Sequence, residues 1–323
     1  MSETMQGSDA PVIEVKNLKK YFLTPHGALH AVDDVSFKIM KGKTLGVVGE
    51  SGCGKSTLGR TIIHLHESTG GNVLLDGRDI TNLNRKELKA AREKMQIIFQ
   101  DPYSSLDPRK SIDSTIREPL QICGRYNKEE IERKTQELMT LVGIDERLQR
   151  SYPHELDGGR RQRVGIARAL ALEPEFIVCD EPVSALDVSI QAQVLNLLKT
   201  LQISRGLTYM FVTHDMSVVR HISDDVCVMY LGQVVEIAPT KEIFEHPMHP
   251  YTQALLSAIP TTDIHNKMKR QLMKGEITSP INPKPGCRFA ARCPFAKAEC
   301  AQPQVQEEVT PGHFVTCSRI HEL

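Results

Sequence analysis

A glycine-rich stretch near the start of the chain has the residue types and spacing of a phosphate-binding loop. GESGCGKST (49–57) fits G-x-x-x-x-G-K-[ST] and follows a short apolar segment, TLGVVG (44–49). Backbone N–H groups would converge on a nucleotide's β-phosphate, Lys55 would reach the β- and γ-phosphates, and the Ser56 hydroxyl would ligate Mg²⁺. A chance glycine-rich turn is disfavoured, because an apolar strand precedes the motif and a helix follows it. The predicted nucleotide contacts are Gly49, Glu50, Ser51, Gly52, Cys53, Gly54, Lys55, Ser56 and Thr57.

Two acidic residues end a second apolar segment, FIVCDEP (176–182). Its apolar residues carry Asp180 and Glu181 to the carboxyl end of a predicted buried strand, where ligands bind in parallel sheets. Asp180 would hold Mg²⁺ through water, and Glu181 would be the general base that polarises the attacking water. Two acids that merely cap a strand are the alternative, and the phosphate-binding loop argues against it. The two motifs together predict ATP hydrolysis.

Composition limits the classes of protein that could carry these motifs. The 323 residues include 40 basic and 40 acidic side chains, so nothing global favours nucleic acid or an anionic membrane as a partner. Apolar content of 40% and charged content of 25% are ordinary for a soluble globular protein. No apolar run approaches the ~20 residues of a membrane span, and the first dozen residues do not resemble a secretory signal. We therefore expect a cytosolic chain.

The apolar periodicity predicts strands alternating with helices around these motifs. Alternating residues near 13–15 and 35–39 indicate β structure, and DVCVMYLGQVVEI (225–237) indicates a hairpin around Gly232. The apolar runs at 44–49, 73–77, 95–100, 176–180 and 208–213 indicate further strands, whereas 111–142 and VSIQAQVLNLLKTLQ (188–202) have helical spacing. The predicted fold class is α/β, with a mixed sheet core, an antiparallel β subdomain and an inserted helical subdomain at about 101–172.

Six motifs stand in the order and spacing of an ATP-binding-cassette (ABC) ATPase. They are the phosphate loop, Gln100 after an apolar strand, LDGGR (156–160), CDEP (179–182), SALD (184–187) and VTHD (212–215). Over roughly 12–260 the chain resembles that P-loop family. YLGQVVEIAPT (230–240) and HPYTQALLSAIP (249–260) further resemble its oligopeptide/dipeptide/nickel importer branch.

The resemblance implies roles for single residues that composition and spacing do not reveal. Gln100 would contact Mg²⁺ or the attacking water and relay changes toward a membrane subunit, and His214 would touch the γ-phosphate. Ser184 and Asp187 would act across an ATPase dimer interface. The alternative for a lone Gln or His is a structural role, as a hydrogen-bonding residue on the surface or in the core.

Two further expectations concern the nucleotide loop and the adenine base. An aromatic residue near the first strand stacks on adenine in the family. Phe22 is favoured for this role, Tyr21 is the runner-up, and packing in the core is the alternative for both. Cys53 should be a small filler whose side chain points away from the nucleotide, although its alkylation could block ATP sterically.

The signature loop departs from the family's usual LSGGQ, because this chain has Leu156, Asp157, Gly158, Gly159 and Arg160. In the family this loop completes the ATP site of the opposite subunit. Asp caps a helix as well as Ser does, but a carboxylate about 5 Å from phosphate costs on the order of 3 kcal/mol per charge at an effective dielectric near 20. Arg160 could compensate, or the partner's site could be weakened. The second hypothesis is favoured, so a paralogous partner is favoured over a homodimer.

Four cysteines crowd into the end of the chain, at Cys287, Cys293, Cys300 and Cys317. The spacing lacks the C-x2-C pair of common zinc sites, and four thiolates suit a [4Fe–4S] cluster, which the resemblance also implies. Zinc and no metal are the alternatives. Residues 261–323 are rich in proline, glycine and cysteine, so we expect a small loop-rich C-terminal module there, following an ABC domain at 12–260.

The resulting hypothesis is an ATP-hydrolysing subunit of a membrane ABC importer for di- or oligopeptides. Nickel or another solute is an alternative, and so, with less support, is a soluble ABC ATPase outside transport. The resemblance implies ATP and Mg²⁺ as ligands, and two transmembrane permease subunits, a second ABC ATPase and an extracytoplasmic solute-binding protein as partners. Nucleic acid is not expected. The chain would lie peripherally on the cytoplasmic face of the inner membrane.

Overall fold

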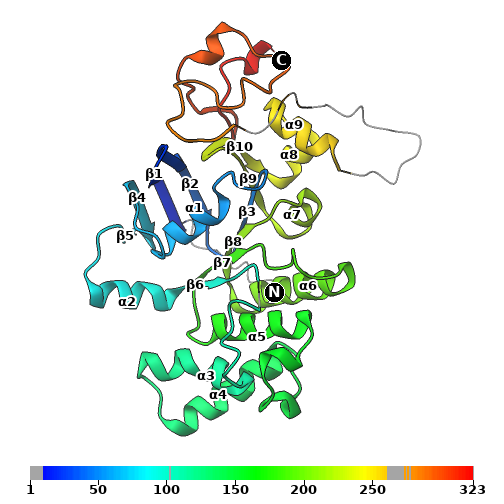
Figure 1. Ribbon diagram of the computed structural model, residues 1–323. Coiled ribbons are helices and arrows are strands. Elements are labelled where there is room, and N and C mark those ends of the chain that lie inside the picture. Colours follow the sequence, from blue (N-terminus) through cyan, green and yellow to red (C-terminus); the bar gives the residue numbers. More distant parts are fainter. Residues whose placement is uncertain (1–9, 102, 260–272, 274, 276–277, 323) are drawn as a thin grey trace, which may run out of the picture. The chain divides into compact units, whose positions relative to one another are not determined.

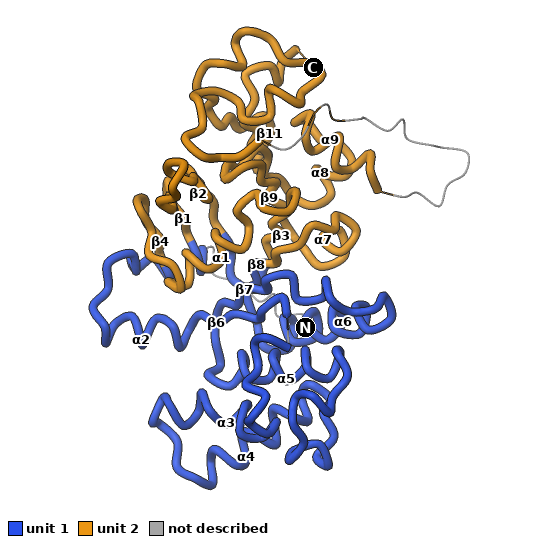
Figure 2. The backbone as a smooth tube through the Cα atoms, viewed as in Figure 1, with its two compact units in different colours: residues 1–13, 39–43, 75–210 blue, residues 14–38, 44–74, 211–323 orange. Residues whose placement is uncertain are grey.

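The computed structural model describes residues 10–101, 103–259, 273, 275 and 278–322 (Figure 1). The chain divides into two compact units (Figure 2). Unit 1 comprises residues 1–13, 39–43 and 75–210, and unit 2 comprises 14–38, 44–74 and 211–323. Each unit is therefore assembled from separate stretches of the chain. The domain division predicted at 260/261 lies outside the described residues and stays a prediction.

Unit 2 contains most of one sheet, in which β1 (Pro11–Thr24) lies between β2 (Gly27–Met40) and β4 (Gly70–Leu75). In the second half of β2, Val35, Phe37 and Ile39 are buried and alternate with more exposed residues. This period of two confirms the strands predicted from the alternation, since successive side chains point to opposite faces of a sheet.

Unit 2 also contains a mixed set of strands that carries the phosphate loop. The fully buried β3 (Thr44–Val48) pairs in parallel with β9 (Asp225–Tyr230), and β9 forms an antiparallel hairpin with β10 (Gln233–Pro239). Gly232 adopts a φ of 84° in the hairpin turn, as glycine readily can, so the predicted hairpin is confirmed.

The cysteine-bearing tail packs against the sheet and the apolar core of unit 2. Its strand β12 (His313–Val315) pairs antiparallel with β10 and with β11 (Glu307–Thr310), so the tail extends the sheet of unit 2. Phe289 is 1% exposed and belongs to the same apolar core as Tyr230 and Tyr251. The tail thus shares the core of unit 2, and the separate C-terminal module predicted at 261–323 stays a prediction.

Unit 1 contains the predicted helical segment. α3 (Ile112–Cys123) packs against α4 (Lys128–Leu141) and α5 (Gly158–Leu170), and these helices gather in one region of the unit (Figure 1). β6 (Met95–Ile98) pairs in parallel with the buried β7 (Phe176–Asp180). The strands and helices predicted in this part of the chain are confirmed.

The remaining helices and strands complete the two units. The helices are α1 (Lys55–Ile62), α2 (Arg85–Lys94), α6 (Val188–Arg205), α7 (Met216–Ile222), α8 (Thr240–Glu245) and α9 (Pro250–Ser257). The short strand β5 (Arg78–Asp79) lies in unit 1, and β8 (Thr208–Val212) passes from unit 1 into unit 2. The 3-10 turns are η1 (Glu146–Leu148), η2 (Pro153–Glu155), η3 (Ala298–Ala301) and η4 (Ile320–Glu322).

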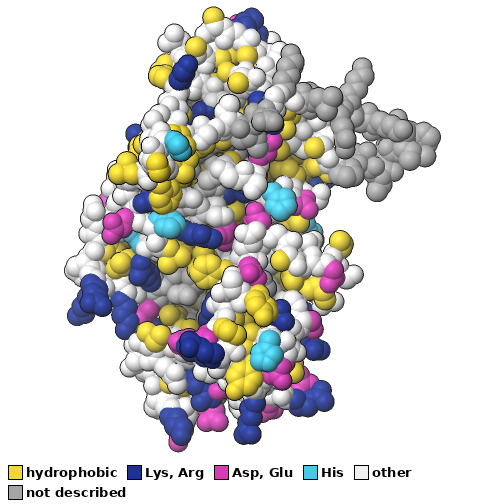
Figure 3. All heavy atoms as spheres, in the orientation of Figure 1, with side chains coloured by type: hydrophobic (Ala, Val, Ile, Leu, Met, Phe, Trp, Pro, Cys, Tyr) yellow, Lys and Arg dark blue, Asp and Glu magenta, His cyan; other side chains and the backbone are white. Residues whose placement is uncertain are grey.

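The surface agrees with the balanced charge of the sequence. Basic and acidic side chains are interspersed on the face shown in Figure 3. Among the described residues, none of the helices has the length and apolar character that a membrane span requires.

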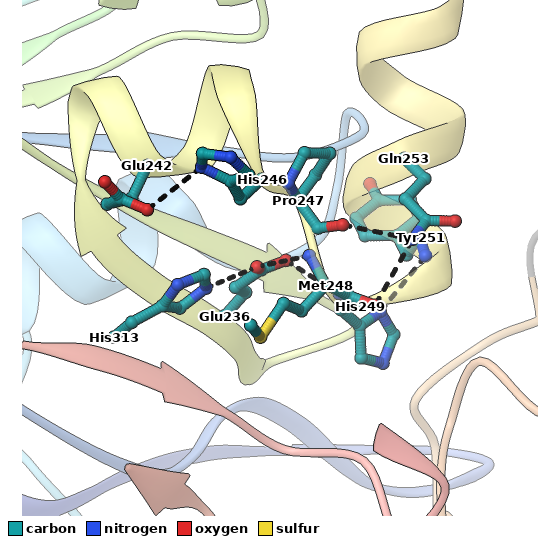
Figure 4. Close-up of polar contacts among 9 residues, drawn as sticks. All are labelled: Glu236, Glu242, His246, Pro247, Met248, His249, Tyr251, Gln253 and His313. Atoms are coloured by element: carbon teal, nitrogen blue, oxygen red, sulfur yellow. Dashed lines mark hydrogen bonds and ion pairs between the residues drawn. The ribbon is translucent and has the colours of Figure 1, made fainter. Parts of the chain in front are cut away.

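A buried carboxylate joins three elements of unit 2 (Figure 4). Glu236 in β10 is 0% exposed and accepts hydrogen bonds from the backbone N–H groups of Met248 (2.8 Å) and His249 (3.0 Å). His313 of β12 pairs with the same carboxylate at 2.7 Å. A buried charge of this kind is stable only when its oxygens are fully engaged. Glu236 therefore fixes the tail strand and the start of α9 to the sheet.

We predict that the neighbouring buried His249 makes the folded state less stable in acid. Burial lowers the pKa of His249 to about 4, and its Nδ1 caps α9 by accepting from the N–H of Tyr251 (3.1 Å). An unfolded histidine titrates near 6.5, so the unfolded chain binds more protons between pH 6.5 and 4, and stability falls as the pH drops through that window. From pH 7 to 5 we expect a loss of about 2 kcal/mol in unfolding free energy from this group.

The variant His249→Asn tests this expectation, because asparagine keeps a capping acceptor and does not titrate. Urea unfolding of both proteins at pH 7 and pH 5 would show a smaller loss of unfolding free energy in the variant. Glu236 and His313 are unchanged in both proteins. An equal loss in the two proteins would contradict the assignment.

Candidate nucleotide-binding and hydrolysis residues

The phosphate loop leaves the end of β3 and enters α1, which begins at Lys55. The Lys55 side chain is 4% exposed and donates to the carbonyl oxygens of Gly49 (2.8 Å) and Glu50 (3.0 Å). The N-terminus of α1 presents backbone N–H groups, and such a terminus favours bound anions. The predicted strand–loop–helix arrangement is therefore present, with its lysine folded along the loop.

Two glycines of the loop are required by close backbone contacts. Gly54, the N-cap of α1, has a φ of 104°, and a Cβ atom there would lie 2.0 Å from the carbonyl oxygen of Ala31. At Gly49, with a φ of 152°, a Cβ atom would lie 2.2 Å from the carbonyl oxygen of Met229. No other residue type fits either position. Ser51 and Gly52 are exposed in the turn between them, and Ser56 and Thr57 lie in the first turn of α1.

Cys53 fills a small space inside the loop. Its thiol is buried, and burial raises its pKa. The Sγ atom lies 3.8 Å from Lys55 Nζ, and the Cys53 carbonyl accepts from the N–H of Gly232 at 2.8 Å. These contacts agree with the small-filler interpretation.

The two candidate adenine-stacking residues have different surroundings within unit 2. Tyr21 stacks on His30 with ring centroids 3.8 Å apart, and its hydroxyl donates to Asp33. Phe22 meets His66 edge-on at 5.6 Å. One face of Tyr21 is thus already covered, whereas Phe22 stays the favoured prediction.

His214 lies two residues beyond the end of β8 and has an exposed side chain. Its neighbour Asp215 caps α7, accepting from the N–H of Ser217 at 2.8 Å. The position at a strand end suits the predicted phosphate contact, which stays a prediction.

The acidic pair closes β7 in unit 1. Asp180 is fully buried at the strand end, and Glu181 follows with a φ of 46°. Gln100, two residues beyond β6, donates from Nε2 to Glu181 Oε2 at 3.0 Å. A left-handed backbone at a glutamate is uncommon, and such strain occurs preferentially at functional positions. The structure thus brings Gln100 and Glu181 together, while their predicted roles toward Mg²⁺ and the attacking water stay predictions.

The signature loop begins α5, with Asp157 as its N-cap. Asp157 Oδ1 accepts from the Arg160 N–H at 2.7 Å, so the predicted cap is confirmed. Arg160 Nε also lies 3.5 Å from Asp157 Oδ2, and both side chains are more than half exposed. A pair this exposed contributes only about 0–1 kcal/mol. Leu156 is buried, and Gly158 starts the helix.

Gly159 and the SALD segment show how the signature region is packed. A Cβ atom at Gly159 would lie 2.6 Å from Ile190 Cγ2, so this glycine allows α5 to approach α6. Asp187 caps α6 by accepting from the N–H of Ile190 at 3.0 Å, and Ser184 Oγ donates to the Glu181 carbonyl at 3.1 Å. Their roles across a dimer interface stay predictions.

The structure does not show the predicted metal centre in the tail. Cys287, Cys293, Cys300 and Cys317 are free thiols that line one small cavity with Phe289 and other residues. Within the described residues, no three His, Cys, Asp or Glu side chains are grouped to hold a metal ion. Burial raises the pKa of the free Cys287 thiol to about 11.

Glu50 of the phosphate loop is held by two residues that no sequence motif predicted. The Glu50 N–H donates to the Tyr251 hydroxyl oxygen at 2.8 Å, and its carboxylate pairs with Arg292 at 2.6 Å. Tyr251 lies in HPYTQALLSAIP (249–260), and Arg292 lies in the cysteine tail. The paired arginines of CRFAARC (287–293) were the available signal.

A glycine loop with a buried lysine between a strand and a helix, and an acidic pair at the end of a buried strand, define a P-loop ATPase. Residues 32–184 match the ABC transporter family, and residues 235–300 match the C-terminal region of oligopeptide/dipeptide transporters. The chain therefore belongs to the ABC transporter family, as one of its ATP-hydrolysing proteins.

Individual relatives and solved structures agree with this assignment. The chain is 51% identical over 318 residues to the oligopeptide transport ATP-binding protein AppF of Bacillus subtilis, covering 95% of this chain and 96% of AppF. It is 48% identical over 313 residues to OppF of Salmonella typhimurium, covering 96% and 94%. A dimeric ATP-binding cassette, MJ0796, solved with ADP and phosphate, is 31% identical with a TM-score of 0.65, covering 71% of this chain and 98% of that one.

Proposed function

We propose that this chain is the ATP-hydrolysing subunit that powers uptake of di- or oligopeptides through a membrane importer. The observation that carries the proposal is the similarity to oligopeptide transport ATP-binding proteins over 95% of the chain, including the C-terminal region at 235–300. Uptake of nickel or another solute by the same ATPase mechanism is the second candidate.

The proposed chemistry divides between residues that bind the nucleotide and residues that act on water. The phosphate loop and Lys55 bind and orient the phosphates. Glu181 accepts a proton from the attacking water, and Gln100 orients that water through its hydrogen bond to Glu181 (3.0 Å). His214 contacts the γ-phosphate, and Phe22 stacks on adenine.

Mg²⁺ is the metal proposed for the hydrolysis reaction. The Ser56 hydroxyl, the Gln100 amide oxygen and the Asp180 carboxylate provide oxygen donors, which Mg²⁺ prefers. When bound, Mg²⁺ neutralises charge that develops on the phosphates.

The proposed partners follow from the transport role. They are two transmembrane permease subunits, a second ABC ATPase and an extracytoplasmic solute-binding protein, with this chain on the cytoplasmic face of the membrane. Solubilising membranes mildly and purifying the complex through this chain tests the proposal. Recovery of two permeases and an ATPase supports it, whereas recovery of ribosomes or nucleic acid would favour a non-transport ABC ATPase.

The altered signature supports a dimer with two unequal ATP sites. The exposed Asp157–Arg160 pair contributes about 0–1 kcal/mol, which is less than the ~3 kcal/mol cost of a carboxylate near phosphate. We therefore place a weakened ATP site in the partner and favour a paralogous partner with an intact signature over a second copy of this chain.

The double replacement Asp157→Ser with Arg160→Gln restores the usual signature and should raise transport-coupled ATP hydrolysis several-fold. Phosphate release by the purified complex is the measurement. A collapse of activity would instead show that Asp157 and Arg160 form a compensated, working pair.

An iron–sulfur cluster or zinc ion on the four tail cysteines is a separate proposal with narrower support. That support is the cavity that the four side chains share. Iron, sulfide and zinc analysis of anaerobically purified protein tests it, and the absence of all three would remove it.

A further inference from the structure

Glu50, the second residue of the phosphate loop, is held at three points. Its carboxylate accepts two hydrogen bonds from Arg292, at 2.6 Å and 3.0 Å. Its backbone N–H donates to the Tyr251 hydroxyl at 2.8 Å, and its carbonyl accepts from Lys55 Nζ at 3.0 Å. A residue whose donor, acceptor and side chain are all engaged has one available orientation, so the start of the loop is fixed.

Arg292 is itself buried and packs against an aromatic ring. Its side chain is 8% exposed, and its guanidinium lies over the Tyr230 ring at 5.9 Å. The hydrogen bonds to Glu50 raise the pKa of Arg292 further above its already high value, so the group stays charged. Two parallel N–H···O bonds give a guanidinium–carboxylate pair both strength and direction.

The segment that carries Arg292 is anchored independently of the phosphate loop. Phe289 contacts Tyr230 and Tyr251 with ring centroids 5.3 Å away in each case. Arg288 donates to the Leu231 carbonyl and to Asp33, the residue that accepts from the Tyr21 hydroxyl. Apolar packing already holds this segment in place. The two hydrogen bonds from Arg292 to Glu50 can therefore position the phosphate loop.

Charge gives Arg292 a second effect on the nucleotide. Glu50 places a carboxylate in the loop that must bind a polyanion, and carboxylate–phosphate repulsion is strong in a partly buried site. Arg292 neutralises that carboxylate. Losing Arg292 would both loosen the loop and expose the phosphates to an uncompensated negative charge.

We propose that Arg292 is a positioning residue for nucleotide binding, through which the cysteine-bearing tail holds the phosphate loop of the ATPase. The inference rests on the proposed function, because it takes the loop at 49–57 as the ATP site. It gives the tail a part in nucleotide binding besides any metal it could carry.

The test is the dissociation constant for ADP, measured with a fluorescent analogue on the full chain. Arg292→Ala should weaken binding about tenfold or more, and Arg292→Lys should weaken it less because the charge remains. Adding Glu50→Gln to Arg292→Ala should recover part of the affinity, since it removes the uncompensated carboxylate. A purely structural arginine would not show this recovery.

Arg319→Ala is the matched control. Arg319 is equally buried in the tail, but it contacts Phe295, Glu299 and Glu322 rather than the loop. It should lower the melting temperature without changing ADP affinity.

Lys55→Ala separates failure of the inference from failure of the proposed function. If Lys55→Ala loses ADP binding while Arg292→Ala stays within twofold of the wild type, the inference is overturned and the function stands. If Lys55→Ala also binds normally, the ATP site itself is misassigned. Should Arg292→Ala fail to fold, an unchanged dissociation constant in Arg292→Lys would overturn the inference.

Discussion

Replacing Glu181 with Gln should slow ATP hydrolysis by about 10²–10⁴-fold while ATP binding persists. The amide keeps the size of the side chain and can still meet Gln100, but it cannot accept a proton from water. Phosphate release by the purified complex measures the rate, and a fluorescent ATP analogue measures binding.

Glu175→Gln is the control for this substitution, because Glu175 lies just before the opposite end of β7 and pairs with Lys94 at 2.7 Å. It should leave the rate near that of the wild type. Hydrolysis by Glu181→Gln at more than about a tenth of the wild-type rate would show that another group is the base.

Replacing Lys55 with Ala should weaken nucleotide binding by about 10²-fold. The lysine is buried along the loop at Gly49 and Glu50, and a lysine–phosphate contact is a charge-assisted hydrogen bond that alanine cannot replace. Titration of a fluorescent ADP analogue provides the dissociation constant.

The exposed Lys41 supplies a control with the same loss of charge outside the loop. Lys41→Ala should bind nucleotide as the wild type does. Equal affinities for Lys55→Ala and the wild type would remove the phosphate loop from the ATP site.

Local sequence patterns were sufficient for the parts of the fold that depend on near neighbours. The period-two run in β2 and the helical spacing of α3 and α4 are each set by which face is buried, and the continuous apolar run of β3 reflects its burial on both faces. Asp157 could be predicted as a cap because capping involves residues three apart.

Pairings between distant segments could not be predicted in the same way. β12 has three residues and no pattern of its own, and its pairing with β10 depends on a buried contact between His313 and Glu236, 77 residues apart. The contact from Arg292 to Glu50 spans 242 residues. Such contacts form only in the completed core, so no local pattern in the tail predicts its packing on the sheet of unit 2.

Peptide uptake by a reconstituted complex tests the central claim most directly. Proteoliposomes would contain the permeases, this chain and its partner ATPase. The solute-binding protein and a labelled oligopeptide would be on the side of the membrane opposite the ATPases. The account predicts uptake that requires ATP, is accompanied by peptide-stimulated phosphate release, and is lost with Glu181→Gln. Uptake that persists in the Glu181→Gln complex, or ATP hydrolysis that no peptide stimulates, would contradict it.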